Sequence, residues 1–170
     1  VGLLGTSAMA LWTMDGGATW GQAATPGAGG DIIYDIKTFP SVFPVQSFCA
    51  VGHFVNGQDN VIMPGALPGE VIHANSGTTH PTSLRGVDFV DTTTGWAVGT
   101  GGTILKSSDG CANWTAQTSG ESGTLQSVDF ADAMTGWALG DGGTIIHTKD
   151  GGSTWTWYLL RSANPRKGLK

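Results

Sequence analysis

Three aspartates in the N-terminal part of the chain are of a residue type that could support acid–base chemistry. Asp31, Asp35 and Asp59 stand outside the regular repeat described below. Hydrolysis of a glycosidic bond needs two carboxyl groups across a cleft, one as the acid and the other as base or nucleophile. Acids in surface loops are common in proteins. We therefore interpret these three as exposed loop residues and expect no catalytic pair.

A second kind of sugar chemistry would use arginines that clamp a carboxylate-bearing sugar beside a tyrosine nucleophile. The chain has three arginines, Arg85, Arg161 and Arg166, and two tyrosines, Tyr34 and Tyr158. Two of the arginines lie within the last ten residues, so we do not expect the arginine triad of a sialidase to assemble. We predict that the protein is not an enzyme.

The sequence contains no pattern for a metal or a cofactor. Cys49 and Cys111 are the two cysteines, and neither lies in a Cys-x-x-Cys pair or in a Cys/His cluster at metal-ligand spacing. A phosphate-binding loop and a Ser-His-Asp spacing are also absent. The cysteines could form one disulfide or remain two buried thiols, and the sequence leaves this open. We expect no cofactor and no metal.

Charge and composition indicate a globular protein that does not bind nucleic acid. Acidic residues outnumber basic ones by 13 to 8, so the net charge is -5 at pH 7, the wrong sign for a phosphate backbone. No run is long and apolar enough for a transmembrane helix. Glycine supplies 28 of 170 residues without a collagen period, which argues against long helices. Half of the basic residues form a separate tail within 158–170.

An internal repeat defines the elements that would position any site. The segment LRGVDFVD from Leu84 recurs as LQSVDFAD from Leu125, and TGWAVG from Thr94 recurs as TGWALG from Thr135, both 41 positions later. Short apolar runs between clusters of Asp, Thr and Gly predict strands and tight turns. Four strands in a unit of about 40 to 45 residues are typical of a β-propeller blade. The predicted fold class is an all-β propeller.

About three and a half blades can be traced along the chain. Regular blades span 83–118 and 124–157, and residues 1–20 match the second half of a blade. A degenerate blade fills 31–80. The number of positions between its residues and the matching residues of the regular blade changes partway along, so we expect an insertion at 53–68 that projects as a loop or hairpin. Because the chain begins in the middle of a blade, we expect it to be part of a larger ring or a longer polypeptide.

One turn of the unit resembles the Asp-box, also called the bacterial neuraminidase repeat. Its copies are TMDGGATW at 13–20, SSDGCANW at 107–114 and TKDGGSTW at 148–155. In such a turn the carboxylate accepts hydrogen bonds from turn amides, glycine takes the positive-φ position and tryptophan covers the base of the hairpin. We therefore expect the boxes to be structural, through Asp15, Trp20, Asp109, Trp114, Asp150 and Trp155.

The longer pattern resembles the photosystem II assembly/stability factor family of propellers. It consists of VDF, TGWAVG or TGWALG, GGTI and the box, and it covers 83–157 well, 3–20 partly and 31–80 loosely. The resemblance implies a seven-bladed, non-enzymatic scaffold that binds protein, as an assembly factor or a structural subunit of a larger complex such as a photosynthetic membrane complex. It also implies an extracytoplasmic location: secreted, periplasmic or in the thylakoid lumen.

Two segments outside the regular blades are candidates for contact with a protein partner. These are the apolar part of the insertion and the basic tail, with the candidate residues Val61, Ile62, Met63, Leu67, Arg161, Arg166 and Lys167.

The alternative function is that of a carbohydrate-active propeller, either a glycan-binding module or a fragment of a sialidase-like or xyloglucanase-like glycosidase. Glycan binding needs aromatic rings that stand free of the core, such as Trp12 and Trp157. Trp96 and Trp137 recur in register instead, so we expect both to be buried.

Overall fold

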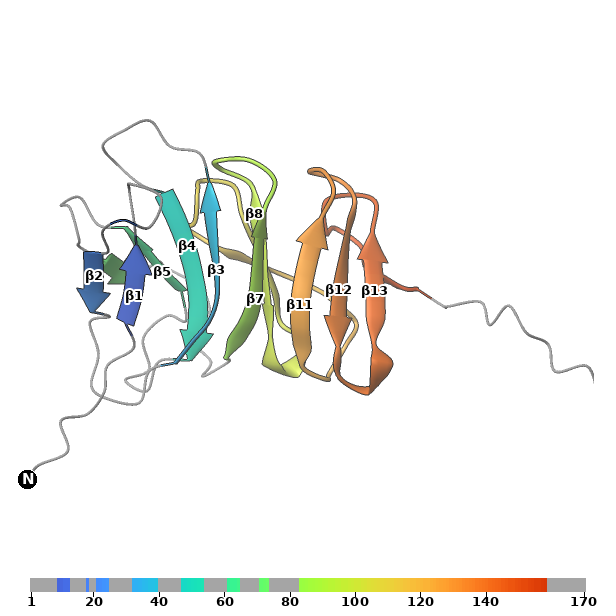
Figure 1. Ribbon diagram of the computed structural model, residues 1–170. Coiled ribbons are helices and arrows are strands. Elements are labelled where there is room, and N and C mark those ends of the chain that lie inside the picture. The colour runs from blue at the N-terminus through green and yellow to red at the C-terminus, as the bar shows by residue number, and fades with distance from the viewer. Residues whose placement is uncertain are drawn as a thin grey trace, which may run out of the picture.

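The computed structural model describes residues 83–158 without interruption, together with residue 18 and the strand segments 9–12, 21–24, 32–39, 47–53, 61–64 and 71–73. Apart from two single 3-10 turns, the regular elements in these ranges are β-strands that pair antiparallel (Figure 1). The part of the chain that is described contains no helix with the length and apolar character to cross a lipid bilayer. The predicted all-β class is confirmed.

Two regular sheets repeat one another strand for strand, each as a four-stranded meander. Blade 2 consists of β7 (Leu84–Phe89), β8 (Gly95–Gly99), β9 (Ile104–Ser107) and β10 (Thr115–Gln117). Blade 3 consists of β11 (Leu125–Phe130), β12 (Gly136–Gly140), β13 (Ile145–Thr148) and β14 (Thr156–Trp157). The 3-10 turns η1 (Thr100–Gly102) and η2 (Asp141–Gly143) join the second and third strands. The Asp-box joins the third and fourth strands.

Two further sheets precede these blades. Blade 1 has the same strand order, with β3 (Ile32–Phe39), β4 (Ser47–His53), β5 (Val61–Pro64) and β6 (Val71–His73). A two-stranded sheet pairs β1 (Met9–Trp12) with β2 (Gly21–Ala24). Figure 1 shows the sheets side by side in chain order, with blade 3 at the end opposite β1 and β2. The four-stranded blades expected from the repeat are confirmed.

Blade 1 differs from the sequence-based expectation at its third strand. The sequence predicts a projecting insertion at 53–68, but β5 lies inside that range and pairs with both β4 and β6. Ile62 stands opposite Ala50 on one side and opposite His73 on the other. The segment GEVIH after Pro68 resembles GTILK of blade 2 because both contain a β-branched run, yet it supplies the fourth strand. Part of the expected insertion is therefore an ordinary strand of the sheet.

The hydrophobic cores lie between neighbouring blades. The first strands β3, β7 and β11 pack next to one another in series. The core between blades 1 and 2 contains Cys49, Val51, Leu84, Val87, Phe89, Ala97, Leu105, Cys111 and Trp114. The core between blades 2 and 3 contains Trp96, Val98, Ile104, Leu125, Val128, Phe130, Ala138 and Ile146. Each large side chain buried there contributes about 1.5–3 kcal/mol of transfer free energy, so the blades stabilise one another.

The recurring Gly-Trp motif has a steric cause. A Cβ on Gly95 would lie 2.6 Å from the ring of Phe89, so the phenylalanine of the VDF motif leaves room only for glycine. Trp96, the next residue, is fully buried against blade 3. The expectation that Trp137 is buried in the same way is wrong, because Trp137 is only half-buried. It lies in blade 3, after which the structure describes no further blade.

Candidate functional site

The aspartates of the described Asp-boxes cap their hairpins. Oδ1 of Asp150 accepts hydrogen bonds from Oγ1 of Thr148 at 2.8 Å and from N of Thr154 at 2.9 Å, and Oδ2 accepts one from Oγ1 of Thr154 at 2.6 Å. The hydroxyl of Thr154 is the main reason that the pKa of Asp150 falls to about 2. Asp109 accepts the corresponding bonds from N and Nδ2 of Asn113. A carboxylate held as an anion in this way is a poor general acid.

The box tryptophans cover the same hairpins. Trp114 is buried, donates its indole N–H to the carbonyl of Cys111 at 3.1 Å and contacts Phe89 edge to face. Trp155 is half-buried and contacts Phe130 in the same manner, with ring centroids 5.9 Å apart. Both tryptophans therefore pack against the phenylalanine of the VDF motif in their own blade.

Other described aspartates also accept backbone hydrogen bonds. Asp91 Oδ1 accepts from N of Thr93 at 2.7 Å, and this bond is the largest cause that lowers the pKa of Asp91 to about 2. Asp35 Oδ2 accepts from N of Val87 in the next blade at 2.9 Å. Asp31 and Asp59 lie outside the described residues. Within the described ranges no cluster of His, Cys, Asp or Glu could hold a metal ion.

The described part of the chain brings one arginine and one tyrosine together, and these come from different blades. The Arg85 guanidinium lies over the ring of Tyr34, 4.0 Å from its centroid. Tyr158 contacts His147 edge to face within blade 3. The Arg85–Tyr34 pair is thus a contact between the first strands of blades 1 and 2. Arg161 and Arg166, the other members of the triad considered from the sequence, lie outside the described residues.

Asp88 links three blades through its carboxylate. Lys37 Nζ of blade 1 lies 2.7 Å from Oδ1, and the backbone N of Phe130 in blade 3 donates to Oδ2 at 2.8 Å. Asp88 is only 5% exposed, and its hydrogen bond with Lys37 is the main cause that raises the pKa of Lys37. Sequence reasoning missed this pair. Alignment of the repeats could have revealed it, because Lys37 stands at the position where the next two blades have Asp88 and Asp129.

A disulfide joins Cys49 of β4 to Cys111 in the box of blade 2, with the Cα atoms 5.9 Å apart. Cys49 stands at the repeat position of Trp96, and Cys111 stands at that of Gly152. At the corresponding junction of blades 2 and 3, Trp96 donates its indole N–H to the carbonyl of Gly151 at 3.2 Å. The sequence left open whether the two cysteines form a disulfide. They do, because both lie at the junction where the second strand of one blade meets the box of the next.

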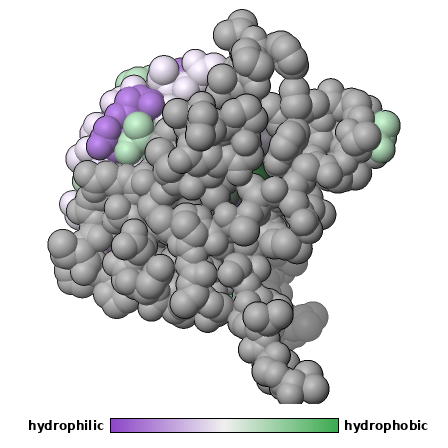
Figure 2. Space-filling view, turned by 90° about the vertical axis from the view of Figure 1, so that its left-hand side faces the viewer, coloured by the Kyte–Doolittle hydropathy of each residue, from purple (hydrophilic) through white to green (hydrophobic). Residues whose placement is uncertain are grey.

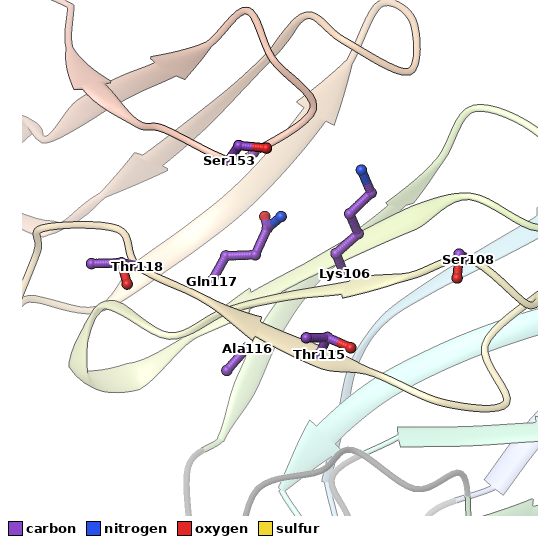
Figure 3. A pocket seen from close by; sticks show the side chains of 8 residues that line it. Lys106, Ser108, Thr115, Ala116, Gln117, Thr118 and Ser153 are labelled. Atoms are coloured by element: carbon purple, nitrogen blue, oxygen red, sulfur yellow. The ribbon is translucent and has the colours of Figure 1, made fainter.

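A groove of about 440 Å³ follows the outer edge of blade 2 beside the box of blade 3. Figure 3 shows Lys106 and Gln117 extending from blade 2 toward the loop that carries Ser153. Lys106 Nζ donates to the carbonyl of Gly151 at 3.0 Å. Hydroxyl groups supply most of the remaining polar lining: Ser108, Thr115, Thr118 and Ser153. An amine, an amide and hydroxyls suit hydrogen bonding to a ligand, whereas acid–base chemistry needs other groups.

The sequence-predicted contact residues are only partly covered by the described structure. Val61, Ile62 and Met63 form most of β5, the third strand of blade 1. The others lie outside the described residues: Leu67, Arg161, Arg166 and Lys167, and with them Asp15 and Trp20 of the first box. Figure 2 views the end that carries β1 and β2; the described residues visible there form a mostly hydrophilic group at the upper left of the view and a smaller hydrophobic one at its right.

A family model described as Photosynthesis system II assembly factor YCF48 matches residues 76–168. No curated protein matches the chain. A solved structure titled "YCF48 bound to D1 peptide" is 29% identical, with a TM-score of 0.43, over 51% of this chain and 29% of that one. The structure of YCF48 from Cyanidioschyzon merolae is 28% identical, with a TM-score of 0.42, over 49% of this chain and 26% of that one.

The chain thus spans less than a third of the length of either solved relative. The family model, in contrast, covers more than half of this chain and includes all of blades 2 and 3. The chain therefore belongs to the family of the photosynthesis system II assembly factor YCF48.

Proposed function

We propose that this protein is a non-catalytic β-propeller scaffold that binds protein, as an assembly factor or a structural subunit of a larger complex. The observation that carries the proposal is the family match over residues 76–168, the part of the chain with the regular blades. Because the family description names photosynthesis system II, the partner that we propose is a component of that membrane complex.

The use of the described carboxylates supports a non-catalytic role. Asp35, Asp88 and Asp91 each accept hydrogen bonds from backbone amides. The box aspartates accept them from their own turns. Hydrolysis of a glycoside needs two carboxyl groups that face a substrate, whereas these groups hold turns and blade junctions together.

Three surfaces are proposed to contact the partner. The first is the groove that contains Lys106 and Gln117, whose polar lining suits the backbone of an extended peptide. The second is the segment of Val61, Ile62, Met63 and Leu67, and the third is the basic tail with Arg161, Arg166 and Lys167. The tail would attract an acidic partner or an anionic membrane surface.

The Cys49–Cys111 disulfide supports an extracytoplasmic location. Structural disulfides persist in oxidising compartments and are rare where glutathione and thioredoxin keep thiols reduced. A secreted, periplasmic or thylakoid-lumenal protein meets that condition.

The test is a binding titration with a D1 peptide, the ligand named with one solved relative. A peptide of the same composition in scrambled order is the control. We expect binding to the D1 peptide alone, weakened by Lys106→Ala and unchanged by Lys149→Ala, which replaces an exposed lysine that does not line the groove. Equal binding of both peptides, or of neither, would contradict the proposal. Binding that survives truncation after Leu160 would remove the tail from the contact surface.

Glycan binding is the second candidate function, because Trp157 is 55% exposed at the outer strand of blade 3. An exposed indole can stack on a sugar ring. Titration with soluble oligosaccharides, followed by tryptophan fluorescence in the parent chain and in Trp157→Ala, tests this candidate. A fluorescence change that saturates in the parent and disappears in the variant would support it, and hydrolysis of a glycoside would contradict the non-catalytic role.

A further inference from the structure

The strand β10 forms the outer edge of blade 2. Among the described strands it pairs with β9 alone, and Thr115, Ala116 and Thr118 along it are exposed. The free edge of a strand presents backbone N–H and carbonyl groups that can pair with another chain, and proteins commonly protect it with lysine, proline or a bulge. β10 has the sequence Thr-Ala-Gln and pairs with β9 in an even register, so it carries none of these protections.

The repeat indicates which backbone groups of this strand face outward. In blade 3 the N–H of Tyr158 donates to the carbonyl of Ile145 at 2.8 Å. The corresponding residues of blade 2 are Gln117 and Ile104, which stand opposite each other. Hydrogen-bonded and non-hydrogen-bonded pairs alternate along antiparallel strands. The N–H and carbonyl of Gln117 therefore point toward β9, and those of Ala116 point toward the open edge.

Two hollows lie along the same edge. The groove of about 440 Å³ and a second hollow of about 400 Å³ share the lining residues Ala116, Gln117 and Thr118. The second hollow extends from there to η1 and to Glu121. A strand added beside β10 would carry side chains that need space next to the edge, and the two hollows supply that space.

The groove also contains polar atoms that are available to a ligand. Nζ of Lys106 donates one hydrogen bond, to the carbonyl of Gly151, whereas an ammonium group has three donors. Oε1 of Gln117 is buried and accepts no hydrogen bond in the described structure. None of the described residues that line the groove is acidic. This combination favours an acidic side chain beside Lys106 and a hydroxyl or amide donor beside Gln117.

We infer that β10 accepts an extended, acidic segment of a partner protein as an additional β-strand. The added strand pairs with the outward N–H and carbonyl of Ala116, and one of its carboxylates lies beside Lys106. In this mode the main-chain hydrogen bonds supply affinity and the hollows beside the strand supply specificity. The inference rests on the proposed function in that the occupant is a protein, and it adds the place, the backbone conformation and the charge of the segment that binds.

The test uses two probes, a D1 peptide and a short peptide of alternating Glu and Thr, each titrated against the full chain. Each probe is also made with backbone N-methyl groups at the odd positions only or at the even positions only. A strand offers its neighbour the N–H groups of alternate residues. One N-methylated form should therefore bind like the unmodified peptide, and the other should bind more weakly by roughly tenfold or more. A peptide held by its side chains alone would not distinguish the two forms.

Three variants of the chain locate the site. Ala116→Pro removes the outward N–H at a kind of position where proline is tolerated, and it should weaken both probes by roughly tenfold with little change in the urea midpoint. Ala133→Pro makes the same replacement in an exposed turn before β12 and should leave binding unchanged. Lys106→Gln should abolish the preference for the Glu–Thr peptide over a Lys–Thr counterpart.

The outcomes separate the inference from the proposed function. Weaker binding of one N-methylated form, together with weaker binding to Ala116→Pro, supports the inference. If the D1 peptide binds, but equally well in every N-methylated form and to Ala116→Pro, the inference is wrong and the proposed function stands. If only the Glu–Thr peptide binds, with the expected pattern, the edge site stands and the proposed partner fails. Binding of neither probe overturns both. If Ala116→Pro does not fold, the N-methylated forms still decide in the parent chain.

Discussion

Trp96 of blade 2 lies flat against Phe130 of blade 3, with the ring centroids 3.5 Å apart and an angle of 7° between the ring planes. The indole N–H of Trp96 also donates to the carbonyl of Gly151 in the box of blade 3. One side chain thus binds the second strand of its own blade to the first strand and the box of the next.

Replacement of Trp96 by alanine should destabilise the protein strongly. We expect Trp96→Ala to lower the free energy of unfolding by about 3–5 kcal/mol, because it leaves a cavity in a closed core. Trp157→Ala is the matched control, since Trp157 is more than half exposed, and it should change the free energy by less than about 1 kcal/mol. Urea unfolding followed by circular dichroism measures both. Equal losses of unfolding free energy in the two variants would show that the contact of Trp96 with Phe130 adds no stability of its own.

Loss of the Cys49–Cys111 disulfide should destabilise the junction of blades 1 and 2. The two cysteines are 62 residues apart, and closing a loop of that length is worth about 4 kcal/mol in the chain-entropy description. Reduction with a thiol reagent should therefore lower the urea midpoint, and the same reagent should leave the double variant Cys49→Ala/Cys111→Ala unchanged.

The backbone at Cys111 offers a finer test. Its φ is 83°, and it stands where the box of blade 3 has Gly152 with φ 87°. Without the disulfide, a non-glycine residue keeps the cost of this left-handed conformation, roughly 1 kcal/mol or more. Cys49→Ala/Cys111→Gly should thus be more stable than Cys49→Ala/Cys111→Ala by about that amount. The reverse order would mean that the turn relaxes once the bond is gone.

Removal of Lys37 should leave the buried Asp88 carboxylate without its counter-ion. We expect Lys37→Met to destabilise by about 1–3 kcal/mol, because an uncompensated buried charge costs more than an exposed pair gains. The control is Lys149→Met, at an exposed lysine, with a change near zero. Thermal unfolding at neutral pH compares the two, and similar melting temperatures would exclude a structural role for the pair.

The same pair predicts an alkaline transition. Hydrogen bonding to Asp88 raises the pKa of Lys37 in the folded protein above the ordinary 10.5. Its stabilisation is therefore complete below pH 10.5 and is lost as the pH rises through the folded value. The melting temperature of the parent chain should fall more steeply in that range than that of Lys37→Met. Parallel curves would contradict the raised pKa.

Asp150 predicts a transition at the acid end. The hydroxyl of Thr154 is the main cause of its pKa of about 2, against an ordinary 3.8. A lowered folded pKa gives stability above pH 3.8 that is lost as the pH falls from 3.8 to about 2. Asp150→Asn should lose less stability than the parent over that range, and Thr154→Val, which removes the leading donor, should be intermediate. Melting temperatures measured between pH 3.8 and about 2 test this prediction. Identical slopes of melting temperature against pH for the three proteins would contradict the lowered pKa of Asp150.

The fold follows from the sequence because the repeat is nearly exact where the blades are regular. The 41-residue spacing of Leu84 and Leu125 predicts matching strands, and β7 and β11 begin at those residues. Blade 1 has diverged further, and its third strand at Val61–Pro64 carries no trace of the GGTI motif. Pairing with β4 defines that strand, and strand pairing is a tertiary property that the local sequence does not encode.

The contacts of the candidate site were harder to predict than the elements. Lys37 and Asp88 lie 51 positions apart, and each belongs to a different blade. A comparison of one repeat with another shows which residues are equivalent, but it does not show which ones meet across a junction. The visible signals were departures from the repeat: a lysine at position 37 where the other blades have aspartate, and cysteines at 49 and 111 where the neighbouring junction has tryptophan and glycine.

The disulfide also bears on how such a chain can be rearranged. Cys49 and Cys111 replace a tryptophan and a glycine of the neighbouring junction, and each replacement suits only its own partner. A deletion of blade 2 would set blade 1 before blade 3 and place Cys49 beside Gly152 as a lone thiol. A duplication that set blade 2 before a copy of itself would place Trp96 beside Cys111. Blades with the same strand order are therefore not exchangeable, because the residues at each junction fit only the blade that follows in this order.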